Sequence, residues 1–426
     1  MKPPEPKKPQ GNIVVRILRI MGPGVITGAA DDDPSGIATY SIAGAQMGTS
    51  LLWTSLASWP LMGAVQMMCA RIGMVTGEGL ASALRRKLPR WVCVVFVVAL
   101  LVVNTINVGA DLAGMADAAE LLTGLNSHVY VVAFGVAIAF VTVRFRYQQI
   151  AQVLKWLCLS LGAYVITAFL SHPRWGAVLH DTLVPGWPAG RDAWGMIVAI
   201  LGTTISPYLF FWQASQEIEE EKAKGRRMLV ERYGATSNEI VNRTLDVGMG
   251  TFFSNVVMFF VILCCASTLH QHGITQITTS REAALALRPL AGNLATLLYT
   301  LGLIGVGCLA IPTLAGSAAY AFAETFDWTE GLDEPYEGAR EFYVVLIVSI
   351  ACGVVMNFLG LSPIRTLYWT AVINGLLAPF LLVGIYLVAT DRKLMGGQPS
   401  SVLGRVVVVA AIVAMFGAGV GLFVTT

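Results

Sequence analysis

The sequence predicts an all-α integral membrane protein with about eleven transmembrane helices. The chain has 426 residues, of which 55% are hydrophobic and 13% are charged, and its mean hydropathy is +0.67. Apolar segments long enough to cross a bilayer recur along almost its whole length. The net charge of +2 gives a nucleic acid little to bind. We therefore expect contact with the lipid bilayer, no nucleic-acid partner and no protein partner.

The organisation of the chain follows from where polar residues interrupt this pattern. Residues 1–11, MKPPEPKKPQG, are rich in Pro and Lys and predict a disordered cytosolic arm. Residues 12–426 predict a single transmembrane domain. Its membrane segments are expected at 13–30 with 37–47, 51–75, 91–122, 129–143, 153–170, 194–217, 247–269, 294–323, 342–359, 367–389 and 402–424.

Three consecutive acids, Asp31, Asp32 and Asp33, interrupt the first segment and are followed at once by Pro34. In an unbroken helix each ionised acid at mid-depth would cost roughly 2.5–3.5 kcal/mol, and the proline would remove a backbone hydrogen bond. Two alternatives avoid this cost. The helix is discontinuous and its unwound backbone lines a cavity, or an external loop joins two ordinary helices.

The distribution of basic residues separates these alternatives. With a discontinuous first helix and a cytoplasmic amino terminus, the basic clusters at 85–90, 144–155, 222–232 and 392–393 all face the cytoplasm, as the positive-inside rule expects. A second helix in place of the break would move most of these charges outside. The discontinuous helix is therefore favoured, and the carboxyl terminus is expected on the extracellular or periplasmic side of the cell membrane.

A second interruption lies five spans later, where Thr203, Thr204, Ser206 and Pro207 cut an apolar run. Taken alone, the proline is more often an ordinary kink. Interruptions at matching positions of two halves, however, are typical of transporters built from inverted repeats, with the site at the bilayer midplane. We therefore expect residues 12–170 and 193–390 to form two five-helix repeats, with 402–424 as an added eleventh helix.

The residues at the two breaks indicate a hard divalent cation. Asp33 offers a carboxylate, the second break offers hydroxyls and freed carbonyls, and neither break contains Cys, His or Met. Oxygen ligands suit Mg²⁺, Ca²⁺ or Mn²⁺. Asp31 and Asp32 either attract the cation or, the interpretation we favour, flank the break at a water-filled mouth.

Other polar residues in the spans are open to two interpretations. Gln66 and Asn374 are amides that would contact a hydrated ion on its path, although hydrogen bonding between helices is the commoner use of such residues. The acidic run at 217–221 either eases the exit of a cation or forms a solvated helix face. We find no set of nucleophile and base and no phosphate-binding loop, so we expect no enzyme and no cofactor.

The motifs around both breaks resemble the Nramp family of divalent-metal transporters. The first span contains GPG, DPSG and AGAQMG where the family usually has DPGN, and the sixth contains GTTISPYLFFWQ where it has A-x-x-MPH. The similarity continues through ARIGMVTGEGLA and GADLAG. It implies a LeuT-like fold with eleven helices, of which the first and sixth are discontinuous.

The resemblance also implies a set of metal ligands. Asp33 corresponds to the metal-binding Asp of the family, Gly36 to its Asn, and Thr203 to the Ala that binds through its carbonyl. Ser206 corresponds to the Met and Tyr208 to a His. Loss of the Met sulfur and of the Asn side chain leaves a larger pocket of oxygen ligands, which resembles the Nramp-related magnesium transporter branch, because Mg²⁺ is usually bound with several waters retained.

The residues that would carry protons in the family are partly lost. Asp111 corresponds to an Asp of the third span, but the Glu that follows it in the family is Gly114 here, and Tyr208 and Gln213 replace two histidines. We therefore expect transport of Mg²⁺, and also of Mn²⁺, by alternating access without proton coupling, with the metal as substrate. The alternatives are a proton-coupled Mn²⁺/Fe²⁺ transporter of the same family and a Na⁺-coupled amino-acid transporter, whose substrate carboxylate Asp33 would repel.

Overall fold

The structure is a computed structural model that describes residues 27–28, 30–145, 159–187 and 190–425. The predicted arm at 1–11, residues 13–26 of the first span and residues 153–158 of the fifth lie outside the described residues. The helices are α3 (Pro34–Met47), α4 (Trp53–Thr76), α5 (Leu80–Arg85), α6 (Arg90–Thr123), α7 (Ser127–Arg144), α9 (Gly162–Leu170), α10 (Trp175–Leu183), α11 (Arg191–Thr204), α12 (Pro207–Ala223), α13 (Leu229–Arg232), α14 (Ser237–Thr268), α15 (Ser280–Leu285), α16 (Arg288–Ala291), α17 (Ala295–Phe326), α18 (Arg340–Met356), α19 (Pro363–Thr390) and α20 (Val402–Val424).

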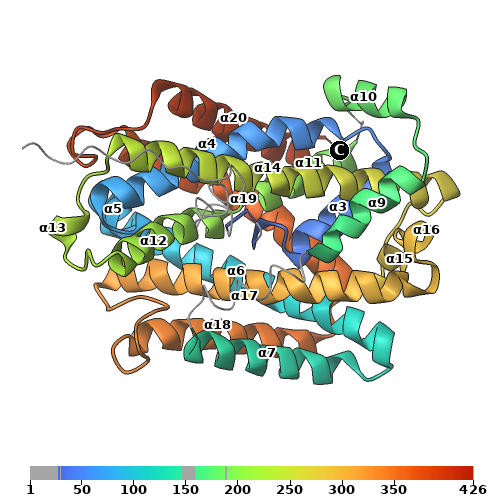
Figure 1. Ribbon diagram of the computed structural model, residues 1–426, viewed down its shortest axis with the longest axis horizontal. Coiled ribbons are helices and arrows are strands. Elements are labelled where there is room, and N and C mark those ends of the chain that lie inside the picture. Colours follow the sequence, from blue (N-terminus) through green and yellow to red (C-terminus); the bar gives the residue numbers. More distant parts are fainter. Residues whose placement is uncertain (1–26, 29, 146–158, 188–189, 426) are drawn as a thin grey trace, which may run out of the picture.

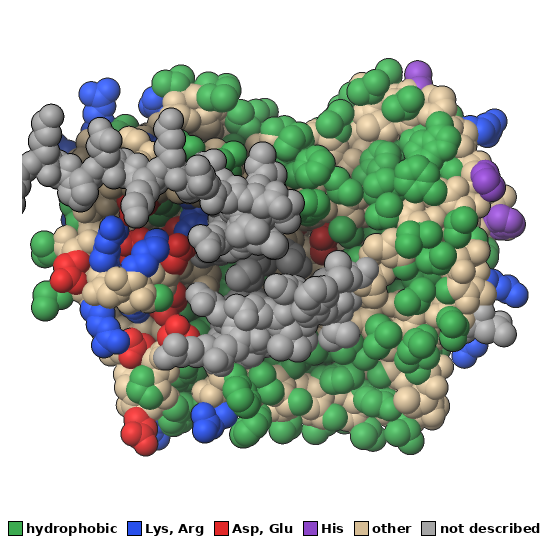
Figure 2. Space-filling model, in the orientation of Figure 1, with side chains coloured by type: hydrophobic (Ala, Val, Ile, Leu, Met, Phe, Trp, Pro, Cys, Tyr) green, Lys and Arg blue, Asp and Glu red, His purple; other side chains and the backbone are tan. Residues whose placement is uncertain are grey.

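The long helices run between two ends of the molecule (Figure 1). Helices α5 and α13 lie at one end, here called the α5 end, and α10, α15 and α16 lie at the other, the α10 end. Charged side chains gather at these ends, and hydrophobic side chains cover the flank between them (Figure 2). Among the described residues, eight helical segments are long and apolar enough to cross a membrane. This arrangement is that of a multi-pass membrane protein, as the sequence predicts.

Both predicted breaks are present. The first ends in an extended residue, Asp33, whose side chain caps α3, with Pro34 in the first turn. The second separates α11 from α12 at Ile205 and Ser206, and Pro207 begins α12. Proline fits both positions because the first helical N–H has no acceptor within the helix. The prediction for the second break was too long, since Thr203 still belongs to α11.

The half-helices that follow the breaks pack in equivalent ways in the two halves. Helix α3 packs on α14 at Gly44, where an added Cβ would lie 2.4 Å from the carbonyl oxygen of Ile262. Helix α12 packs on α4 at Gly73, where an added Cβ would lie 2.6 Å from the carbonyl oxygen of Ala214. Only glycine allows either approach. Helix α3 therefore meets α14 as α12 meets α4, which is the relation expected of an inverted repeat.

Helix α14 extends beyond the membrane segment predicted at 247–269. Helix α14 begins at Ser237, ten residues before the predicted start at 247, because Thr236 and Glu239 form a capping box at its amino terminus. The first stretch of this helix, residues 237–246, is not part of the predicted membrane segment. Arg243 lies in this stretch and is nearly buried, and it forms ion pairs with acids of α12 and of α14 itself.

Candidate cation site

The carboxyl group of Asp33 lies at the centre of the first break and accepts hydrogen bonds from several sides. One oxygen, Oδ1, accepts from the hydroxyl of Ser35 at 2.7 Å and from the backbone N–H of Gly36 at 2.7 Å. The other, Oδ2, accepts from the amide of Asn107 on α6 at 3.2 Å and, at 3.5 Å, from the hydroxyl of Tyr208 on α12. The side chain of Asp33 is 1% exposed. Three separate helices thus meet at one buried carboxylate.

The two breaks meet at Gly36. A Cβ added to this glycine would lie 3.0 Å from Oγ1 of Thr203 and 3.5 Å from Oδ1 of Asp33. Thr203 Oγ1 is buried, has no hydrogen bond of normal geometry and faces the hydroxyl of Tyr40. Tyr208 ties the breaks together from the other side, because its hydroxyl donates to the carbonyl of Ala30 at 3.0 Å. The structure therefore brings together three of the four predicted metal ligands and the tyrosine beside them.

The remaining hydroxyls of the second break turn back onto their own helix. Ser206 donates to the carbonyl oxygens of Thr203 at 2.6 Å and Gly202 at 2.9 Å, so it caps the end of α11. Thr204 donates to the carbonyl oxygen of Ile200 at 2.8 Å. Both hydroxyls act as donors here, so each keeps its lone pairs free to accept.

Asp31 and Asp32 flank the first break as predicted, but both are buried, so the expectation that they lie at a water-filled mouth was wrong for this conformation. They share one donor, the hydroxyl of Ser254 on α14, at 2.7 Å and 3.2 Å. The second oxygen of Asp31 has no hydrogen bond. Within the described residues, no Lys, Arg or His forms an ion pair with either acid or with Asp33.

A polar stripe on α6 reaches the site from the third span. Asn104, Asn107 and Asp111 recur at a spacing of three and four residues, so they share one helix face, and all three are fully buried. The carboxyl group of Asp111 faces the backbone N–H of Ser35, but neither of its oxygens makes a hydrogen bond of normal geometry. Sequence reasoning found Asp111 and missed Asn107. The helical spacing of the three residues was the signal that would have found it.

The predicted pathway amides are buried but do not bond to Asp33. Neither polar atom of the Gln66 side chain has a hydrogen-bond partner, and Oδ1 of Asn374 has none. The helix-to-helix hydrogen bond expected for Gln66 is therefore not formed in this conformation. Gln213 donates to Glu217 at 2.7 Å, and its carbonyl oxygen is without a partner. These three side chains keep unused polar atoms inside the protein.

The acidic run at 217–221 lies within the last turns of α12 and is mostly buried, so the interpretation as a solvated helix face was wrong, whereas a role in the exit of the cation stays a prediction. Glu217 is 2% exposed and pairs with Arg243 of α14 at 2.8 Å. Lys222 pairs with Glu219, and Arg226 pairs with Glu221. A single arginine from the neighbouring helix, distant in sequence, neutralises the innermost acid, and no local pattern reports this.

Outside the spans, ion pairs join the loops of the α5 end. Lys87 donates to Asp391 and holds the pKa of that carboxyl at about 2, and backbone N–H groups of the same loop add to the effect. Arg85 donates to Asp327 and lowers the pKa of that carboxyl as well. These pairs connect the last residue of α5 to the end of α17, and the loop after α5 to the end of α19.

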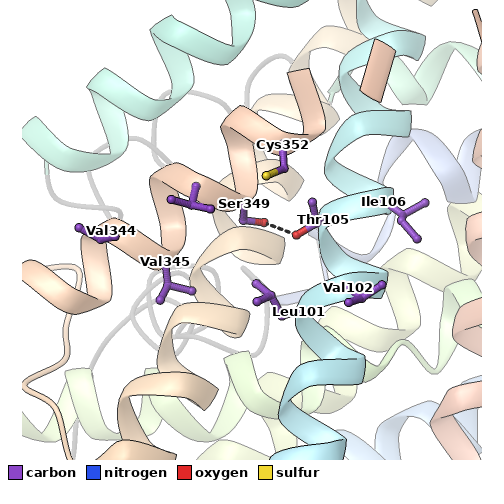
Figure 3. Close-up of a pocket in the computed structure, with 9 residues that line it drawn as sticks. Leu101, Val102, Thr105, Ile106, Val344, Val345, Ser349 and Cys352 are labelled. Atoms are coloured by element: carbon purple, nitrogen blue, oxygen red, sulfur yellow. Dashed lines mark hydrogen bonds between the residues drawn. The ribbon is translucent and has the colours of Figure 1, made fainter. Parts of the chain in front are cut away.

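A cavity of about 400 Å³ lies between α6 and α18, on a different face of α6 from the aspartates (Figure 3). Its walls are mainly aliphatic, and its two hydroxyls, on Thr105 and Ser349, bond to each other at 2.9 Å. Such a lining offers no charge to a cation. We therefore place the candidate cation site at the helix breaks and not in this cavity.

Comparisons with known proteins agree with the motifs. A model of the family Nramp, described as natural resistance-associated macrophage protein-like, matches residues 24–425. The divalent metal cation transporter MntH of Yersinia enterocolitica is 25% identical over 408 residues, which cover 93% of each chain. MntH of Yersinia pestis (strain Pestoides F) is also 25% identical over 408 residues, again covering 93% of each chain.

Solved structures show the same fold. The Eremococcus coleocola manganese transporter superposes with a TM-score of 0.76 and 17% identity, over 96% of this chain and 87% of that one. Mhp1, a transporter of the nucleobase-cation-symport-1 family in a closed conformation, superposes with a TM-score of 0.56 and 13% identity, over 94% of this chain and 93% of that one. Both the family match and the fold agree with the prediction, and the chain therefore belongs to the Nramp family.

Proposed function

We propose that the protein transports divalent metal cations, Mg²⁺ first and Mn²⁺ second, by alternating access and without proton coupling. The observation that carries this proposal is the cluster of oxygen atoms around Gly36, where Asp33 of the first break faces Thr203 of the second. One carboxylate with hydroxyl and carbonyl oxygens is a donor set for a hard cation. The family match supports metal transport over the amino-acid alternative.

In this proposal the cation binds between the two breaks. The carboxylate of Asp33, the carbonyl of Thr203 and the hydroxyl of Ser206 are its ligands. Water that the ion retains completes its shell when the two breaks move apart at Gly36, where an added Cβ would lie 3.0 Å from Oγ1 of Thr203. Mg²⁺ loses its waters reluctantly, so a site with few protein ligands and room for water suits it. Around the hydrated ion lie the polar groups with unused atoms or shared donors, Asp31, Asp32, Gln66, Asp111, Gln213 and Asn374, and the Tyr208 hydroxyl.

The surroundings of Asp111 support transport without protons. A proton relay along α6 needs ionisable groups between the site and one end of the helix. Towards the α5 end the next polar residues on this face are two amides: Asn107, which donates to Asp33 at 3.2 Å, and Asn104, which donates to the carbonyl of Leu314 and to Ser317, both at 2.9 Å. An amide does not exchange its protons with a neighbour at neutral pH, because it is neither acidic nor basic there. Gly114, on the other side, has no side chain to receive a proton.

The membrane potential supplies enough energy for uncoupled uptake. We propose that the α5 end, with its basic loops, faces the cytoplasm. An inside-negative potential of 100 mV then favours the inward movement of two charges by about 4.6 kcal/mol. This is about a 2,000-fold bias in the equilibrium distribution of the ion, since 1.36 kcal/mol corresponds to a factor of ten.

The test compares cations in one preparation. Purified protein is reconstituted into liposomes with a clamped inside-negative potential, and uptake of Mg²⁺, Mn²⁺ and Ca²⁺ is measured with trapped dyes, alone and in competition. We expect saturable uptake of Mg²⁺ and Mn²⁺ that empty liposomes lack. Uptake of Mn²⁺ that an excess of Mg²⁺ does not reduce would contradict the assignment of Mg²⁺.

A further inference from the structure

We propose that Asn107 substitutes for the cation in the empty transporter. When no ion is bound, its amide N–H donates a hydrogen bond to the carboxylate of Asp33. When the site is loaded, the amide rotates and its carbonyl oxygen faces the ion or a water bound to the ion. This inference rests on the proposed cation site. It assigns to α6 a binding residue that exchanges its donor for an acceptor during each cycle.

The geometry around Asp33 Oδ2 carries the proposal. Asn107 Nδ2 donates to this oxygen at 3.2 Å, and its own carbonyl oxygen, Oδ1, is buried without a partner. The second donor, Tyr208, lies at 3.5 Å and makes its shorter bond, at 3.0 Å, to the carbonyl of Ala30. The side chain of Asn107 is fully buried, so bulk water does not supply the missing partner. One half of this amide is bonded to the ligand and the other half is unused.

Electrostatics explains why such a group is needed. Asp31, Asp32, Asp33 and Asp111 are all buried, and within the described part of the chain none of them forms an ion pair. A buried carboxylate without a cation is costly unless hydrogen bonds replace the lost water. A carrier coupled to protons solves this by protonation on the empty return. An amide donor does so without any proton from solution.

The side chain of asparagine is suited to both states. Rotation of the amide by about 180° exchanges two donors for an acceptor with two lone pairs, with almost no change of shape. A cation that binds Oδ2 of Asp33 takes the lone pair that the N–H uses, so the N–H must leave. The carbonyl then lies where the N–H was and faces a positive charge, which an oxygen ligand stabilises.

The neighbouring asparagine on the same helix face is a matched control. Asn104 lies about one turn from Asn107 and is equally buried, but both its donor bonds go to α17, at Leu314 and Ser317. It joins two helices and does not touch Asp33. Substitutions at Asn104 therefore report the cost of losing a buried amide from α6 without the proposed exchange.

The first test uses Asn107→Asp, which keeps an oxygen for the loaded state and removes the donor from the empty state. Relative to wild type in proteoliposomes, we expect KM for Mg²⁺ to fall at least tenfold and the maximal rate of net uptake to fall at least tenfold, because the empty return becomes unfavourable. Exchange of internal Mn²⁺ for external Mn²⁺, which needs no empty return, should keep at least half of its rate. A KM within twofold of wild type, or net uptake and exchange reduced equally, would overturn the proposal.

A second pair keeps the test decisive if that variant does not fold. Asn107→Ser has a hydroxyl that both donates and accepts, whereas Asn107→Leu does neither. We expect the serine variant to retain at least ten times the net uptake of the leucine variant, while Asn104→Ser and Asn104→Leu differ by less than threefold. Equal rates for the two Asn107 variants would refute the exchange. All assays are run with Mg²⁺ and with Mn²⁺. If wild type transports Mn²⁺ but not Mg²⁺, the choice of Mg²⁺ as substrate is overturned, and the Asn107 variants are compared with Mn²⁺.

Discussion

The substitution Asp33→Asn removes the charge at the centre of the candidate site and keeps its shape. In the empty protein, the bonds from Ser35 and Gly36 to Oδ1 remain possible, because asparagine retains one oxygen. The new amide group would replace Oδ2 and face the donors of Asn107 and Tyr208. The Asn107 amide relieves this conflict by rotating to present its carbonyl. We therefore expect a folded protein.

The charge lost in Asp33→Asn sets the size of two effects, a small loss of folding stability and a large loss of cation affinity. Hydrogen bonds to a charged group contribute about 1.5–3 kcal/mol and neutral ones about 0.5–1.5 kcal/mol, so each retained bond weakens by about 1 kcal/mol. Loss of one of four buried acids offsets part of this. For the cation, a unit charge pair at 4 Å and an effective dielectric of 20 contributes about 4 kcal/mol, hence about 8 kcal/mol for a divalent ion before desolvation. Even if only a third of this survives desolvation, affinity falls by about a hundredfold.

The assay separates binding from folding. Thermal unfolding of wild type and variant in detergent is followed with and without Mg²⁺, and uptake is measured in liposomes. The variant should unfold within a few degrees of wild type, lose the stabilisation by Mg²⁺ and transport at the level of empty liposomes. Asp117→Asn, at the far end of α6 where Asp117 accepts from Ser280, is the matched control and should transport normally. Transport by folded Asp33→Asn protein at the wild-type rate would remove this residue from the site.

Two further predictions concern selectivity and the interior ion pairs. The double substitution Gly36→Asn with Ser206→Met should raise the ratio of Mn²⁺ to Mg²⁺ uptake about tenfold in competition assays. The thioether favours softer ions, and the asparagine side chain fills the space beside Thr203. An unchanged ratio would show that other residues set the selectivity. Arg243→Met should destabilise the protein by about 3–5 kcal/mol, since it leaves Glu217 buried without its partner. Arg226→Met, at a side chain that is 40% exposed, should cost less than about 1 kcal/mol. Equal falls in the unfolding temperature of the two variants would contradict the assignment of a buried pair.

The sequence predicts the breaks correctly because proline and adjacent acids cannot be accommodated in an apolar helix by any other local structure. Asp33 and Thr203 are recognisable for the same reason, since both lie at points where the backbone loses regular hydrogen bonds. The spans at 91–122, 129–143, 367–389 and 402–424 agree closely with α6, α7, α19 and α20. Periodicity and length are sufficient for such helices, which are apolar over most of their length.

Contacts between distant segments were not predictable from local patterns. The local sequence around Glu217 is typical of a solvated acid, but α12 and α14 both pack on α4, and Arg243 of α14 reaches Glu217 as an ion-pair partner. The local sequence around Asn107 is typical of any amide on a helix, and only the packing of α6 against the first break places it beside Asp33. The local sequence around Asp31 and Asp32 is typical of solvated acids, but in the structure both are buried and share the hydroxyl of Ser254 on α14 as donor. In each case the partner of the polar residue lies on another helix, so the local sequence does not show the interaction.

The central claim is that Mg²⁺ crosses without a proton, and one measurement tests it directly. Liposomes containing the protein hold a pH-sensitive dye and a Mg²⁺ dye, and K⁺ with valinomycin clamps the potential while external Mg²⁺ is added at equal pH on both sides. The account predicts that internal Mg²⁺ rises with the imposed potential while internal pH stays at the level of empty liposomes. Internal acidification that depends on Mg²⁺, on the protein and on Asp33, above the leak of empty liposomes, would contradict it and establish proton coupling.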